Sequence, residues 1–117
     1  MAYLLLIVEP REQRSMRSAA EGQDVYARMQ EFAAGLKARG VLTAVESLKS
    51  DADGARVAVR GGKRSVIDGP FAEAKEMIGG FFLLDCRTRA EAVAIAAACP
   101  AAEWATVEVR ETGPCYE

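Results

Sequence analysis

Acidic residues dominate one short stretch of the sequence, DGPFAEAKE (residues 68–76), which places Asp68, Glu73 and Glu76 close to Lys75. Carboxyl groups beside an apolar groove can have their pKa values pushed apart, because desolvation and like-charge repulsion disfavour the ionised form while a lysine favours it. A carboxyl group tuned in this way can act as a general acid or base. The stretch therefore predicts proton transfer on a small molecule, with Asp68, Glu73 and Glu76 as the catalytic candidates.

The candidates for substrate binding lie inside and outside this stretch. They are Phe71, Lys75, Glu46 and Arg110, the last two on condition that their strands bring them near. Asp68 is the central candidate because the following Gly-Pro forces a turn that fixes it at a strand end. A structural interpretation has equal weight: Asp68 accepts backbone N–H groups of the turn, and Phe71 anchors the loop on the core.

The residue types argue against a metal or an organic cofactor. The chain has no histidine, and its cysteines, Cys86, Cys99 and Cys115, form no CxxC pair. Transition-metal sites are usually built from histidine and thiolate groups. The carboxylates leave an oxygen-only Mg²⁺ or Ca²⁺ site open, although their spacing matches no calcium-binding loop. We expect no cofactor, and cysteines that are buried apolar groups or free thiols.

Charge and hydropathy narrow the classes of partner. Fifteen basic and seventeen acidic residues give a net charge of −2, which provides little attraction to nucleic acid or anionic lipid. The apolar run near the N-terminus is much shorter than the roughly 20 residues of a membrane span, and no basic segment precedes it. The cysteine pattern suits a reducing compartment. We expect a cytoplasmic protein that binds neither nucleic acid nor membrane.

Hydrophobic periodicity predicts the elements that position these residues. A buried strand at residues 3–8 is followed by a helix whose apolar positions begin at Val25 and which stops at Gly40. Strands are expected at 41–48, on either side of Gly61-Gly62, at 79–86 and at 105–110. The Gly-Gly pair predicts a two-residue hairpin turn. Thr88 and Glu91 have capping-box spacing at the start of a second helix, which ends before Pro100.

These elements predict a single domain over residues 1–117 of the α+β class. Two helices can pack on one face of a mostly antiparallel sheet, as in a ferredoxin-like sandwich. The first strand and the run FFLL, residues 81–84, are apolar on both faces, so the uncovered face should expose an apolar patch. We expect a homodimer packed sheet to sheet, with ligand pockets lined by the uncovered face.

The same residues resemble a known family. DGPFAEAKE followed by GGFFLLD is similar to the signature of the YCII-related proteins, in particular their DGPF-domain branch. The likeness extends over nearly the whole chain, from YLLLI at residues 3–7 to Cys99-Pro100 and TVEVR at residues 106–110. A nine-residue block in register with its flanking elements is a specific signal.

This resemblance implies a dimeric α/β barrel of ferredoxin-like class. Members of the wider superfamily are enzymes that act on small, often aromatic or lactone-like molecules, and some YCII-type proteins are thought to use a His and Asp pair. The sequence departs from the pattern at Ala74, where threonine is usual, and at Ala44 to Glu46, where Gly-Gly-Glu is usual. Because histidine is absent, a His-Asp pair is impossible in this chain.

Two functions follow as hypotheses. The first is an acid-base enzyme of lyase or isomerase type, which uses carboxylates in a groove at the dimer interface. The second is a non-catalytic small-molecule-binding or regulatory module. For this module the resemblance implies a sigma-type transcription factor as a partner, because members of the DGPF branch are often associated with sigma factors of the extracytoplasmic-function type.

Overall fold

The computed structural model describes residues 2–116 as six strands, two α-helices and three short 3₁₀ turns. The strands are β1 (Tyr3–Pro10), β2 (Leu42–Ser47), β3 (Ala55–Arg60), β4 (Lys63–Asp68), β5 (Glu76–Leu84) and β6 (Thr106–Glu111). The helices are α1 (Ala19–Ala38) and α2 (Arg89–Ala98), and the 3₁₀ turns are η1 (Arg14–Met16), η2 (Asp51–Asp53) and η3 (Pro100–Glu103). No helix in this part of the chain is both long enough and apolar enough to cross a bilayer.

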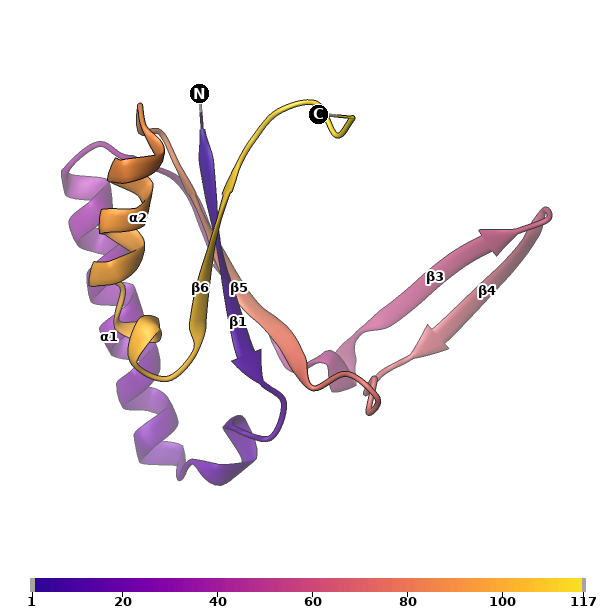
Figure 1. Ribbon diagram of the computed structural model, residues 1–117. Coiled ribbons are helices and arrows are strands. Elements are labelled where there is room, and N and C mark those ends of the chain that lie inside the picture. The colour runs from indigo at the N-terminus through magenta and orange to yellow at the C-terminus, as the bar shows by residue number, and fades with distance from the viewer. Residues whose placement is uncertain (1, 117) are drawn as a thin grey trace.

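Four strands form the main sheet in the order β2-β5-β1-β6, and every neighbouring pair is antiparallel. Figure 1 shows α1 and α2 on the same face of this sheet. This arrangement confirms the predicted α+β, ferredoxin-like class. Strand β1 alternates regularly between the two faces, with Tyr3, Leu5 and Ile7 buried against the helical layer. They join Phe82 and Leu84 of β5 and side chains of both helices in one core.

Both helices begin at capping residues. The side chain of Ser18 accepts the backbone N–H of Glu21, whose carboxylate accepts the N–H of Ser18 in return, so α1 starts with a full capping box. Helix α1 therefore begins six residues before Val25, the first apolar position that indicated a helix. At α2 only half of the predicted box forms, because the Glu91 carboxylate accepts the N–H of Arg87 and not that of Thr88.

The face of the main sheet opposite the helices is apolar along its centre. Leu4 and Leu6 of β1 pair with Leu83 and Phe81 of β5 on this side, and all four are only partly buried. Figure 1 shows no helical layer over this face. The prediction of an uncovered apolar sheet face is confirmed for residues 2–116.

Strands β3 and β4 form the predicted hairpin, and its turn residues Gly61 and Gly62 have φ values of 58° and 75°. This hairpin is a separate two-stranded sheet and forms an arm that projects away from the helices (Figure 1). Its side chains are nearly all exposed, including Val57 at 64% and Ile67 at 60%. Since an isolated hairpin is marginally stable in water, the arm depends on how its base is attached.

Candidate functional site

The predicted acidic stretch forms the loop at the base of this arm. Phe71 is buried, whereas Asp68, Glu73, Lys75 and Glu76 are exposed. Asp68 is the last residue of β4, and Glu76 is the first residue of β5. The acids of the stretch are thus close in sequence but face solvent. Of the predicted residues in this loop, Phe71 and Glu76 line a shallow cavity of about 520 Å³ between η2 and the start of β5.

Arg11, immediately after β1, holds this loop in place. Its guanidinium forms a two-pronged ion pair with Asp51 of η2, with 2.8 Å between Nη1 and Oδ1, and donates from Nε to the carbonyl of Ala74 at 2.6 Å. Both partners of the ion pair have only 15% of their side-chain surface exposed. Arg11 holds the pKa of the Asp51 carboxyl below its usual value, and the backbone N–H of Phe71 adds to this effect. Asp51 therefore organises the loop, a role that the sequence interpretation gave to Asp68.

Phe71 and Gly69 show why the loop has this composition. The Phe71 ring lies under the guanidinium of Arg56, 3.9 Å from the ring centroid, and Arg56 also donates to Glu73 at 3.1 Å. Gly69 packs against the backbone of η2 so closely that a β-carbon would lie 2.8 Å from the carbonyl carbon of Asp51 and closer still to its oxygen. The glycine is required by this backbone approach.

Glu46 and Arg110 lie on opposite edges of the main sheet. Glu46 of β2 pairs with Phe81, whereas Arg110 of β6 pairs with Leu4 and donates to Glu108 at 3.2 Å. Two strands separate β2 from β6, so their backbones are about 14 Å apart at a spacing of about 4.8 Å per strand. The structure of one chain therefore does not bring Glu46 and Arg110 together.

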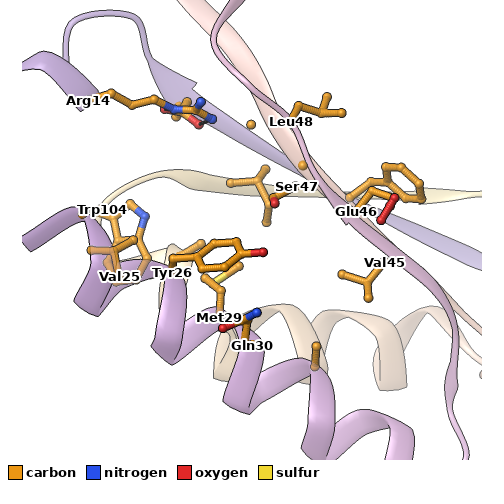
Figure 2. Close-up of a pocket in the computed structure, with 18 of the residues that line it drawn as sticks. Arg14, Val25, Tyr26, Met29, Gln30, Val45, Glu46, Ser47, Leu48 and Trp104 are labelled. Atoms are coloured by element: carbon orange, nitrogen blue, oxygen red, sulfur yellow. Dashed lines mark hydrogen bonds and ion pairs between the residues drawn. The ribbon is translucent and has the colours of Figure 1, made fainter. Parts of the chain in front are cut away.

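A cavity with a volume of about 820 Å³ lies on the helix-covered face, between α1 and the sheet (Figure 2). This location differs from the predicted one on the uncovered face, because the cavity is lined by the first part of α1, from Ala19 to Ala33, and by residues of β2 and β5. Tyr26, Met29 and Gln30 of α1 face Val45 and Ser47 of β2 across this space in Figure 2. The lining also includes Ile7, Glu9, Arg14, Arg17, Val25, Glu46, Leu48, Gly79, Phe82 and Trp104.

Glu9 is the buried acid of this cavity, with only 6% of its surface exposed. Both of its carboxylate oxygens accept hydrogen bonds from Arg14, at 2.9 Å from Nε and 2.8 Å from Nη2. The Glu9 side chain packs over Gly79 of β5, where a β-carbon would lie 2.9 Å from the Glu9 Cδ atom and 3.1 Å from Arg14 Nη2. A charged carboxylate is thus held by a fixed cation at the wall of a ligand-sized space.

Trp104 lies at the N-terminal end of α1, next to two arginines. The guanidinium of Arg17 is 5.7 Å from the centroid of its ring, and that of Arg28 is 5.2 Å away. Trp104 and Tyr26 both line the cavity, and Tyr26 has 52% of its surface exposed.

Sequence reasoning did not select Glu9 and Arg14, because the signal for Glu9 becomes readable only when the buried face of β1 is known. Glu9 continues the alternation of Tyr3, Leu5 and Ile7, so its side chain had to share the buried face of β1. An acidic residue at a core-facing position of a strand is rarely buried without a paired cation. Because β1 is apolar on both faces, this alternation does not appear in the sequence pattern itself.

Cysteines and possible metal ligands complete the inventory of reactive side chains. Cys86 and Cys99 are buried and Cys115 is exposed, and all three are free thiols, as predicted. Within residues 2–116, no three side chains of His, Cys, Asp or Glu are grouped as a metal ion would require.

The fold and the cavity define a small α+β protein with a ligand-sized site between one helix and the sheet. The family model of the YCII-related domain matches residues 1–114. The chain belongs to the YCII-related family. No curated protein matches it.

Proposed function

We propose that the protein is an acid-base enzyme of lyase or isomerase type that acts on a small molecule in the cavity between α1 and the sheet. The observation that carries this proposal is the buried carboxylate of Glu9 at the cavity wall. The volume of about 820 Å³ is in the range of small-molecule sites, which are mostly apolar with a few convergent polar groups.

Glu9 is the group that moves the proton in this proposal. Its environment excludes most water, and Arg14 compensates its charge, so the carboxylate is held in one orientation. A base held in this way can take a proton from a carbon next to a carbonyl group and return it at a neighbouring position. Tyr26, Gln30 and Ser47 supply hydroxyl and amide groups that can hydrogen-bond the substrate carbonyl. The chemistry requires no organic cofactor.

The loop acids form a second proposed location for the same chemistry. Asp68, Glu73 and Glu76 would act as catalytic groups, with Lys75 as their counter-charge, if a second copy of the chain covered them and removed their water. Support comes from their proximity to the cavity of about 520 Å³ that Glu76 and Phe71 line.

Matched isosteric variants test the two locations. Glu9→Gln retains the shape of the side chain and removes its basicity, and Asp68→Asn does the same in the loop. On a panel of small carbonyl and lactone compounds, Glu9→Gln should lower kcat/KM at least 100-fold, within the range that general acid-base groups contribute. Asp68→Asn should remain within threefold of wild type. The opposite result would move the active site to the loop.

We also propose that the functional unit is a homodimer formed through the uncovered sheet face. Support comes from the partly buried row of Leu4, Leu6, Phe81 and Leu83, which extends over two central strands. Size-exclusion chromatography with light scattering should give twice the chain mass of 12.6 kDa at micromolar concentration. Leu6→Glu should give the mass of one chain without changing the circular dichroism spectrum, whereas a wild-type monomer would refute the dimer.

One observation favours a non-catalytic binding module as the second candidate. Arg14 already bonds both oxygens of Glu9, so the carboxylate is satisfied without a substrate. In that case Glu9→Gln would weaken ligand binding, and no compound of the panel would be turned over. Association with a sigma-type factor belongs to this candidate, and a pull-down that recovers such a factor would support it.

A further inference from the structure

We propose that the ligand of the cavity carries an anionic group, and that Arg17 binds this group beside Trp104 while the apolar part of the ligand lies between α1 and the sheet. This inference rests on the proposed function only for the location of the ligand site. It names the chemical class of the ligand as a small organic anion with an apolar body, such as a carboxylate.

The first observation is the pairing of the arginines around Trp104. Arg14 is paired with Glu9, and Arg28 is paired with Glu103 at 2.8 Å. Within residues 2–116, Arg17 has no carboxylate oxygen within 4.0 Å and its side chain donates no hydrogen bond. Arg17 is partly buried and is one of the residues that line the cavity. A partly buried cation that forms no direct ion pair, at the wall of a cavity, is suited to bind an anion.

The second observation is that Glu21 and Glu9 form their hydrogen bonds with partners other than Arg17. The Glu21 carboxylate accepts the N–H of Ser18 in the cap of α1, and its pKa is lowered by the hydrogen bonds with Ser18 and to a smaller extent by the charge of Arg17. The Glu9 carboxylate is held by two bonds from Arg14. The Arg14 Nη1 group donates to neither Glu9 oxygen, so it remains as a second donor for an anion at this end of the cavity.

The third observation concerns the rest of the lining. Val25, Met29, Val45 and Phe82 give the cavity an apolar lining. Gly79 and Gly80 of β5 also line it and have no side chains that would occupy the space. Figure 2 shows Val25 and Trp104 together at one end and Val45 at the other. A ligand with a charged head at Arg17 and an apolar body along Met29 would therefore match the distribution of polar and apolar groups.

The chain provides its own reporter for a test, because Trp104 is its single tryptophan. The probes are phenylacetate and phenylacetamide, which have nearly the same shape and differ in charge. Titration at neutral pH, followed by Trp104 fluorescence and by calorimetry, should give a dissociation constant at least tenfold lower for phenylacetate. Arg17→Gln should reduce this preference to less than about twofold.

Arg28→Gln is the matched control, since Arg28 contacts the same ring from outside the cavity lining and is paired with Glu103. It should leave the preference unchanged. Equal affinity for the two probes, no binding of either, or an equal loss in both arginine variants would overturn the proposal. The titration involves no turnover, and in Glu9→Gln the preference for phenylacetate should persist. A failure of catalysis and a failure of anion binding are therefore distinguishable.

Discussion

Replacement of Gly69 by alanine should destabilise the protein strongly, although no side-chain interaction is lost. The new β-carbon would lie 2.8 Å from the carbonyl carbon of Asp51 and closer still to the oxygen, whereas ordinary contacts begin at 3.4 Å. The opposing atoms belong to backbone. They cannot turn away as a side chain can, and η2 is held at this position by the ion pair of Asp51 with Arg11.

The size of the effect follows from this lack of freedom. Insertion of a methyl group into a packed region costs about 1–3 kcal/mol, and a rigid backbone neighbour places Gly69→Ala at the upper end, about 3 kcal/mol. For a chain of 117 residues this corresponds to a decrease in melting temperature of about 10 °C. Thermal and urea unfolding followed by circular dichroism measure both quantities.

Gly35→Ala is the matched control. Gly35 lies inside α1, and a β-carbon there would meet no atom within 4 Å. Because alanine favours the helix by about 0.5–1 kcal/mol over glycine, this variant should melt at a slightly higher temperature. If Gly69→Ala melts within 2 °C of wild type, the interpretation of the loop as a backbone contact fails.

Two further predictions concern the ionisable groups. Arg11 lowers the pKa of the Asp51 carboxyl in the folded protein. The ion pair therefore stabilises the fold fully above the pKa of Asp51 in the unfolded chain, about 4, and this stabilisation is lost as pH falls through the lower pKa of the folded state. Melting temperature should therefore fall steeply in wild type below pH 4 and less steeply in Asp51→Asn, and parallel curves would contradict the role of the ion pair. Burial raises the pKa of the Cys86 and Cys99 thiols, which slows their reaction as thiolates. A disulfide reagent at pH 8 should titrate one thiol rapidly, that of Cys115, and a rapid reaction of all three would show that the core opens.

The fold could be predicted from the sequence because each element has a local signal. The apolar runs of β1 and β5, the helical spacing from Val25 and the glycine pair at the hairpin turn each depend on neighbours within a few residues. What could not be predicted is how the hairpin sits relative to the sheet. The two strands of a hairpin form backbone hydrogen bonds with each other. The sequence pattern of the hairpin is therefore the same whether it joins the main sheet or projects from it as an arm.

The candidate site was harder to predict because its contacts are distant in sequence. Arg11 and Asp51 are 40 residues apart, and Glu9 meets Gly79 across 70 residues. The conspicuous acids at residues 68–76 drew attention, whereas the structure exposes them to solvent and buries Glu9 in the wall of the large cavity. The clustering of acids in the sequence indicated a turn, whereas the burial of Glu9 depends on how α1 packs against the sheet.

The most direct test of the proposed ligand site is the location of a bound small molecule. Crystals of the protein grown with the phenylacetate probe should show difference density between Met29 and Gly79, with the carboxylate within 3.2 Å of an Arg17 nitrogen. Density on the uncovered sheet face or beside Asp68, with the space between α1 and the sheet filled only by water, would contradict it.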